Sequence, residues 1–320
     1  MDSFSRKLAV VTGGGSGMGR ELVRQLAAQG CSVAACDLHE RAVEDAAAVA
    51  RDGAPAGVRV TTQVLRFRDD LVEQHASDHV DLVFSNAGIG GGSSFISDSR
   101  EEWERTFAID WWGVYYCARA FLPLLIASGE GVLVNTSSVN GFWASLGPGI
   151  PQTAYSTAKF AVKGFSEALI EDLRTHAPHI RVAVVMPGHV GTDIIMNSLR
   201  ARGLPAPEQM SDAQLGELIP AEAQAKLIEA GRLPKGAPAD ELRQMLVRMN
   251  ANFRDKAPLS AADAATVILD GVRSGAWRIL VGDDARKLDA AVRAKPGAAY
   301  DYAELFSLLA EQPTAGSPER

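Results

Sequence analysis

Leu8-Ala-Val-Val-Thr-Gly-Gly-Gly-Ser-Gly-Met-Gly19 joins a short apolar run to a glycine-rich turn. Leu8–Val11 is typical of a strand buried in a parallel sheet, and Arg20–Gln29 continues with a helical pattern. Glycines allow a close approach of the backbone to a ligand, and a helix N-terminus offers unpaired N–H groups and a positive dipole end. This order predicts a phosphate-binding cradle, formed by Gly13, Gly15, Ser16, Gly17, Met18 and Gly19.

Asp37 follows the next apolar run, Cys31–Cys36, about twenty residues after the glycine turn. In a dinucleotide-binding fold, a carboxylate there accepts hydrogen bonds from the adenosine ribose and repels a 2′-phosphate. Asp37 could equally cap the helix that follows it. Its position after the turn favours the cofactor role and predicts NAD rather than NADP.

Further apolar runs alternate with helical patterns along the chain. We expect strands over Val58–Val64, Val80–Ser85, Gly131–Thr136 and Ile180–Met186, and helices over Glu101–Ala127, Gln152–Thr175 and Ala261–Ser274. Such alternation predicts an α/β fold with a Rossmann-type, doubly wound parallel sheet, whose ligands lie beyond the carboxyl ends of the strands.

Tyr155 and Lys159 lie four residues apart, so a helix would place both side chains on one face. A phenol titrates at about pH 10 in water, and a nearby ammonium lowers that pKa toward the working range. Ser138 ends an apolar run, where its hydroxyl would face a cleft. The Tyr–Lys spacing alone also fits an ordinary amphipathic helix, so the functional interpretation depends on the other motifs.

Together these motifs resemble those of the classical short-chain dehydrogenase/reductase family in order and spacing. The matching positions are Thr12–Gly19, Asn86-Ala-Gly88, Ser138, Tyr155-x-x-x-Lys159 and Pro187-Gly-x-x-x-Thr192. The resemblance covers about residues 6–195, with Ala276–Gly282 as a seventh strand. It implies a homodimer or homotetramer in which Glu101–Ala127 and Gln152–Thr175 pack against their symmetry mates.

The resemblance also implies the roles of the site residues. Tyr155 would exchange a proton with the substrate oxygen, Lys159 would lower the tyrosine pKa and hold the ribose hydroxyls, and Ser138 would bind the substrate oxygen. The other implied cofactor contacts are Asn86, Ala87, Gly88, Pro187, Gly188, Val190 and Thr192.

Three positions depart from the family pattern. Asp110 stands where the catalytic tetrad usually has asparagine, and its carboxylate would oppose the effect of Lys159 on Tyr155. Arg66 falls where an aspartate usually contacts adenine, and Arg66 or Arg68 could reach a 2′-phosphate. Ser85 replaces the first of two asparagines, which should matter little.

The chain is expected to form one Rossmann-type core, residues 1–200 and 259–282, with two additions. Residues 201–258 contain many prolines, and Leu242, Met245, Leu246, Met249 and Phe253 recur at helical spacing. This insertion predicts a helical lid over the substrate; a surface elaboration or a subunit contact is the alternative. Residues 283–320 would form a helical C-terminal extension with a frayed tail from Pro313.

Composition narrows the range of partners. The 320 residues carry a net charge of −7 without long basic runs, which argues against nucleic acid or an anionic membrane. Cys31, Cys36 and Cys117 form no C-x-x-C pair, so we expect free thiols, no metal site and a cytoplasmic location. We expect neither a signal peptide nor a membrane-spanning segment.

The predicted function is interconversion of a secondary alcohol and a ketone by hydride transfer with a nicotinamide cofactor. Phe142, Trp143, Leu146 and Ile150, between Ser138 and Tyr155, favour a bulky hydrophobic small-molecule substrate. The alternatives are an epimerase or dehydratase on the same fold, or a catalytically silent NAD-binding sensor.

Overall fold

A computed structural model describes residues 1–64, 74–91, 94–229, 231 and 233–311. The chain divides into two compact units, one formed by Met1–Val190 with Pro258–Arg320 and the other by Gly191–Ala257. Arg66, Arg68 and the predicted frayed tail lie outside the described residues.

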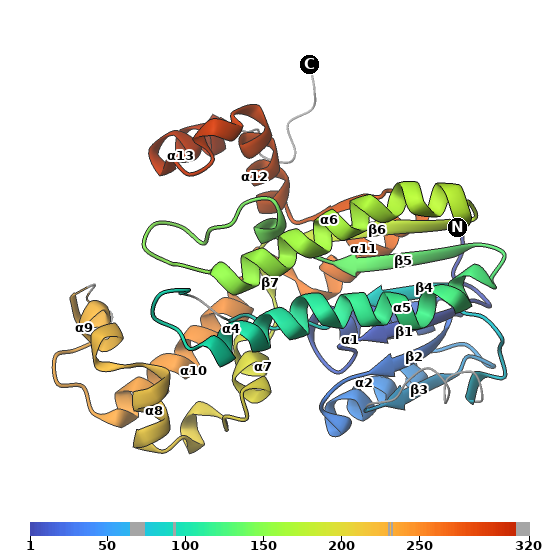
Figure 1. Cartoon of the computed structure of the whole chain (residues 1–320). Coiled ribbons are helices and arrows are strands. Elements are labelled where there is room, and N and C mark those ends of the chain that lie inside the picture. The colour runs from blue at the N-terminus through green and yellow to red at the C-terminus, as the bar shows by residue number, and fades with distance from the viewer. Residues whose placement is uncertain (65–73, 92–93, 230, 232, 312–320) are drawn as a thin grey trace. The chain divides into compact units, whose positions relative to one another are not determined.

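The first unit contains a seven-stranded parallel sheet among its described residues (Figure 1). The strand order is β3-β2-β1-β4-β5-β6-β9. Successive strands are added on one side of β1 as far as β3 and on its other side from β4 onward, so the strand order reverses between β1 and β4. This is the predicted doubly wound sheet, whose reversal point is where such folds bind ligands. The strands are β1 (Leu8–Thr12), β2 (Ser32–Cys36), β3 (Val60–Gln63), β4 (Leu82–Ser85), β5 (Gly131–Thr136), β6 (Ile180–Pro187) and β9 (Arg278–Val281).

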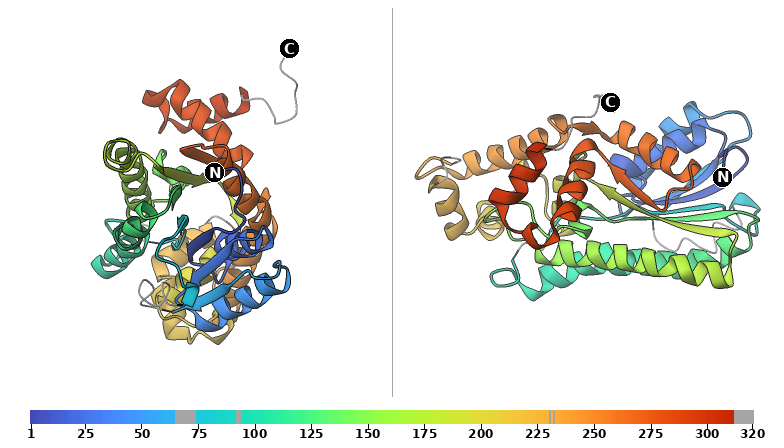
Figure 2. Two further views of the ribbon diagram at one scale, coloured as in Figure 1. Left: turned by 90° about the vertical axis from the view of Figure 1, so that its right-hand side faces the viewer. Right: turned by 90° about the horizontal axis from the view of Figure 1, so that it is seen from above.

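Helices cover both faces of this sheet, as the two layers in Figure 2 show. One face packs against α1 (Gly17–Ala28), α2 (Glu40–Asp52) and α11 (Ala261–Arg273). The other packs against α5 (Gly113–Ile126) and α6 (Thr153–His176). The remaining elements of this unit are α4 (Arg100–Phe107), α12 (Asp283–Ala294), α13 (Tyr302–Glu311), the π-helical segment η1 (Ala108–Trp112), and the 3₁₀ segments η2 (Val139–Gly141) and η4 (Pro296–Ala298).

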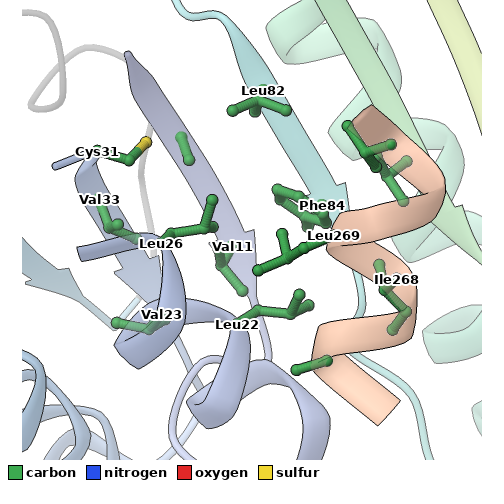
Figure 3. Close-up of a cluster of buried hydrophobic side chains, with 14 of the residues drawn as sticks. Val11, Leu22, Val23, Leu26, Cys31, Val33, Leu82, Phe84, Ile268 and Leu269 are labelled. Carbon is green, nitrogen blue, oxygen red and sulfur yellow. The ribbon is translucent and has the colours of Figure 1, made fainter. Parts of the chain in front are cut away.

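The core is apolar on both sides of the sheet because its strands are buried on both faces. Figure 3 shows the cluster between β1, β4, α1 and α11, where Val11, Leu22, Phe84 and Leu269 meet. All four are at most 1% exposed, so this cluster contributes hydrophobic stabilisation along the whole β1–α1 unit that carries the glycine turn.

The predicted helix Glu101–Ala127 is interrupted, which sequence periodicity did not indicate. α4 begins after Ser99, whose side chain accepts a hydrogen bond from Glu102 N–H. Five residues of π-helix, Ala108–Trp112, then separate α4 from α5. A π-helical turn changes the direction of the side chains that follow. Asp110 lies within this segment and is completely buried.

The second unit has its own apolar core. It consists of α7 (Ile194–Ala201), the 3₁₀ segment η3 (Pro207–Gln209), α8 (Asp212–Leu218), α9 (Ala221–Glu229) and α10 (Ala239–Asp255). Leu199, Met210, Leu215 and Leu246 are buried in one cluster. Arg254 pairs with Asp193 at 3.1 Å within the unit. The predicted lid covers residues 201–258, whereas this compact unit begins about ten residues earlier, at Gly191.

The short strands β7 (Val190–Gly191) and β8 (Leu259–Ser260) complete the described secondary structure. No described helix is long and apolar enough to cross a membrane.

Candidate active site

In the glycine turn after β1, close backbone contacts leave no room for a side chain at Gly13 or Gly19. Gly13 and Gly17 adopt φ values of 67° and 52°, which only glycine adopts without strain. A Cβ on Gly19 would lie 2.0 Å from the carbonyl oxygen of Gly13. Ser16 is the N-cap residue of α1, and Met18 lies in the first turn of that helix. The turn therefore brings a bare backbone and a helix N-terminus together.

The Asn86–Gly88 segment after β4 is tied to the same turn. Thr12 Oγ1 accepts hydrogen bonds from the N–H groups of Asn86 and Ala87, both at 3.0 Å. The amide of Asn86 donates to the carbonyl of Thr12 at 3.2 Å, while its buried Oδ1 has no partner in the described part of the chain. Together with the glycine turn, these features fit a dinucleotide cofactor.

Asp37 lies at the end of β2 and contacts the glycine turn. Its Oδ2 accepts a hydrogen bond from Gly15 N–H at 3.0 Å, and its Oδ1 accepts one from His39 N–H at 3.1 Å. His39 is the N-cap residue of α2, so Asp37 also orders the entry into that helix. The alternative role of Asp37 as the cap of α2 is wrong, because the N-cap residue is His39.

Tyr155, Lys159 and Ser138 come together beyond the carboxyl end of β5. Tyr155 and Lys159 share one face of α6, and the ammonium nitrogen lies 5.3 Å from the centre of the tyrosine ring. Lys159 Nζ donates to the carbonyl of Thr136 at 3.3 Å. Ser138 follows β5, and its hydroxyl lies near enough to Tyr155 to oppose the rise in the pKa of the phenol. The three side chains predicted to carry the chemistry are therefore neighbours.

Asp110 joins this cluster through the π-helical segment. Its Oδ1 lies 3.3 Å from Lys159 Nζ and accepts a hydrogen bond from Ile89 N–H at 3.1 Å. Its other oxygen is buried without a partner among the described residues. A Cβ on Gly88 would lie 2.6 Å from Oδ1, so a glycine at this position lets the carboxyl reach the lysine.

Burial and charge set the proton affinities of these groups. Burial raises the pKa of the Tyr155 phenol above its usual value. The Lys159 ammonium lowers this pKa, the Asp110 carboxyl raises it further, and the Ser138 hydroxyl lowers it. Burial disfavours the Lys159 ammonium, but Asp110 and Tyr155 favour it and raise the lysine pKa above its usual value. Burial likewise raises the pKa of the Asp110 carboxyl against the opposing effects of Lys159 and Ile89 N–H.

The loop after β6 contacts α12, which the sequence did not indicate. Asp284 Oδ2 accepts a hydrogen bond from His189 N–H at 2.6 Å, and its carboxyl lies so close to Gly188 that a Cβ there would be 2.3 Å away. Pro187 ends β6 and Val190 is buried, both in the first unit, whereas Thr192 belongs to the second.

Asn140 is a further site residue that sequence reasoning missed. Its N–H donates to Ser138 Oγ at 3.1 Å, and its side chain is 3% exposed. Its position in the sequence could have indicated this role, because a polar side chain two residues after Ser138 can bind the loop that follows the serine. Asp284 gave no comparable signal, since it lies 95 residues from His189.

Comparison with known proteins defines the family. A model of the short chain dehydrogenase family matches residues 7–203, and the chain belongs to this family of oxidoreductases. The putative oxidoreductase SadH of Mycobacterium tuberculosis (strain ATCC 25618 / H37Rv) is 35% identical over 212 residues, 63% of this chain and 74% of that protein. The (3R)-3-hydroxyacyl-CoA dehydrogenase of Mus musculus is 33% identical over 198 residues, covering 58% and 74%.

Solved structures confirm the fold. A short-chain dehydrogenase/reductase from Burkholderia phymatum in complex with NAD is 24% identical with a TM-score of 0.69, and the match covers 100% of both chains. A metagenomic short-chain oxidoreductase in complex with NADP is 26% identical with a TM-score of 0.50, covering 58% of this chain and 83% of that one.

No group of three or more His, Cys, Asp and Glu side chains within the described ranges could hold a metal ion. The three cysteines are free, and burial raises the pKa of Cys117 to about 11 and that of Cys36 to about 12.

Proposed function

We propose that this protein interconverts a secondary alcohol and a ketone, with a nicotinamide cofactor and Tyr155 as the general acid and base. The observation that carries the proposal is the Tyr155–Lys159–Ser138 cluster at the carboxyl end of the sheet, beside a glycine turn that fits a dinucleotide. The name of the relative that is a 3-hydroxyacyl-CoA dehydrogenase supports the same reaction class.

Each side chain has one task in this proposal. The glycine turn and Asp37 would hold a nicotinamide dinucleotide, which would supply or accept the hydride at the carbon that bears the substrate oxygen. Tyr155 gives its hydroxyl proton to that oxygen in reduction and removes it in oxidation. Ser138 orients the oxygen by a hydrogen bond, and Lys159 stabilises the phenolate electrostatically. Asp110 holds the lysine ammonium through the 3.3 Å pair.

We expect NAD rather than NADP as the cofactor. A carboxylate at Asp37, already placed against the glycine turn, would repel a 2′-phosphate and accept hydrogen bonds from ribose hydroxyls. The similar structure from Burkholderia phymatum holds NAD and the metagenomic one holds NADP, so neither indicates which cofactor this chain prefers. As the resemblance to the family implies, Thr192 and the backbone near Val190 would fix the carboxamide.

A bulky, hydrophobic small molecule is the substrate class that we propose. Leu146 and Ile150, in the loop before α6, are each 50% exposed and could contact such a molecule. Phe142 and Trp143 instead pack in a cluster with α12 and α13. Residues 201–258 would act as a lid, a role that their separate apolar core permits.

The test is a panel of hydrophobic ketones and alcohols, including acetophenone and 1-phenylethanol, followed by nicotinamide absorbance with NADH, NADPH and their oxidised forms. We expect turnover with at least one pair and higher kcat/KM with NAD(H). Conversion without net cofactor consumption would indicate an epimerase or dehydratase. Cofactor binding without any turnover would indicate a sensor.

We also propose a homodimer or homotetramer assembled through the outer faces of α5 and α6. Tyr116 is 63% exposed and Phe160 is 41% exposed, so both helices carry aromatic surface that the sheet does not cover. Light scattering at micromolar concentration should give the mass of a dimer or tetramer, and the mass of a single chain would contradict this proposal.

A further inference from the structure

The loop between Ser138 and α6 is bound to the turn that carries the serine. Asn140 donates from its side-chain amide to the carbonyls of Trp143 and Ser145, at 3.1 and 2.8 Å. The backbone N–H of the same residue donates to Ser138 Oγ at 3.1 Å. The position of Ser145 and the orientation of Ser138 are therefore connected through one buried residue.

The C-terminal segment contacts this loop from the other side. The hydroxyl of Tyr302 lies 2.9 Å from Ser145 Oγ, and the indole N–H of Trp143 donates to the carbonyl of Ala299 at 2.7 Å. Trp143 also packs with Leu305 in an apolar cluster formed with α12 and α13. Ser145 is buried at 5% exposure, and Tyr302 is partly buried.

The rest of the loop is only loosely packed. A cavity of about 500 Å³ lies between residues 144–157 and the side chains of Tyr300 and Tyr302. Gly147 and Gly149 have positive φ values of 112° and 75° in the same stretch. The cavity leaves space for displacement of this part of the loop. Two tyrosine hydroxyls of the C-terminal segment hold it: Tyr302 contacts Ser145 Oγ at 2.9 Å, and Tyr300 accepts a hydrogen bond from Ala144 N–H at 3.1 Å.

We propose that Tyr302 is a positioning residue: its hydroxyl holds Ser145 and, through Asn140, fixes the orientation of Ser138. The C-terminal segment is in this way a part of the catalytic unit. The effect on catalysis rests on the proposed function, in which Ser138 binds the substrate oxygen. The contacts from Tyr302 through Ser145 and Asn140 to Ser138 do not depend on that function.

Tyr302→Phe tests the chain of contacts, because it removes the hydroxyl and keeps the ring in its apolar surroundings. Hydrogen–deuterium exchange should be faster at the amides of residues 139–147, by about fivefold for the loss of one hydrogen bond. Exchange in β5 and α11 should not change. Thr266→Val, which removes a hydroxyl from an exposed position on α11, is the control and should leave residues 139–147 as in the wild type.

Ser145→Ala removes the contact with Tyr302 and also the hydrogen bond that Ser145 Oγ accepts from Gly147 N–H at 2.9 Å, so its effect should be at least as large as that of Tyr302→Phe. The double variant should equal Ser145→Ala, because the contact with Tyr302 is already lost in that single variant. Ser145→Thr, which keeps a hydroxyl, should restore slow exchange. Unchanged exchange in Tyr302→Phe, or additive effects in the double variant, would overturn the proposal whether or not a substrate is known.

Kinetics test the link to Ser138. With acetophenone and NADH, or the best pair from the panel, Tyr302→Phe should lower kcat by about fivefold while the NADH dissociation constant and Tm stay unchanged. Faster exchange without any change in kcat or KM would refute a positioning role. Absence of turnover in the wild type would refute the proposed function. The exchange data would still show whether the Tyr302–Ser145 contact fixes the loop.

Discussion

The glycine turn and the catalytic cluster lie at the same end of the sheet but are held by different kinds of contact. The turn depends on close backbone approaches, such as that between Gly19 and Gly13. The cluster depends on buried charge, since Lys159 and Asp110 are 3% and 0% exposed. Changes in the turn should therefore act through sterics on cofactor binding, whereas changes in the cluster should act on proton transfer and its pH dependence.

The largest effect on the turn is expected from Gly19→Ala. The new Cβ would lie 2.0 Å from a backbone oxygen, which no side-chain rotation can relieve. We expect a loss of about 1–3 kcal/mol in unfolding free energy and no measurable NADH binding. Denaturant unfolding and NADH fluorescence titration measure these quantities.

Gly53→Ala is the matched control for this substitution. Gly53 follows α2 with φ of −92°, and a Cβ there meets nothing within 4 Å. Stability should be equal or higher, because alanine reduces the conformational freedom of the unfolded chain. If Gly19→Ala behaves like Gly53→Ala, the steric account of the turn is wrong.

A smaller effect is expected from Asp37→Asn, which removes charge and keeps one oxygen that can accept from Gly15 N–H. The ratio of kcat/KM for NADPH over NADH should rise about tenfold, which corresponds to about 1.4 kcal/mol of relieved repulsion. Asp52→Asn, at an exposed position on α2, should leave the ratio unchanged. An unchanged ratio in Asp37→Asn would argue that this carboxylate does not select the cofactor.

The subtlest effect is expected from Asp110→Asn, which changes charge within the cluster. Asp110 raises the pKa of Tyr155, so its neutral analogue should lower that pKa. Alcohol oxidation needs the phenolate, and its rate increases as pH rises toward the tyrosine pKa. The rising limb of the oxidation profile should therefore move to lower pH while activity persists.

Ketone reduction, which needs the protonated tyrosine, should change little near neutral pH in the same variant. The pH profiles of kcat in both directions, at saturating cofactor, check this prediction. An unmoved oxidation limb would remove Asp110 from the proton-transfer cluster and leave it a structural role.

The sequence was sufficient to predict the parts of this protein that depend on local pattern. Apolar runs predicted the strands to within a few residues. The prediction that Tyr155 and Lys159 lie on one face of a helix is confirmed. The Gly13–Gly19 turn was predictable because glycine has a specific conformational role there.

Contacts between distant segments could not be predicted in this way. The π-helical segment around Asp110 leaves an apolar pattern almost unchanged, so one continuous helix was expected. Asp284 and Tyr302 reach the loops near the site from the C-terminal helices, and nothing in their own neighbourhoods indicates it. Such contacts arise from tertiary packing, which a single sequence does not encode as a local signal.

Tyr155 is the proposed proton donor and acceptor, and Tyr155→Phe removes only the hydroxyl that would perform this role. With wild-type and variant protein compared in parallel, we expect kcat to fall by about 10²–10⁴-fold and the NADH dissociation constant to stay within about twofold, since only a hydroxyl is removed. Near-normal turnover in Tyr155→Phe would contradict the account.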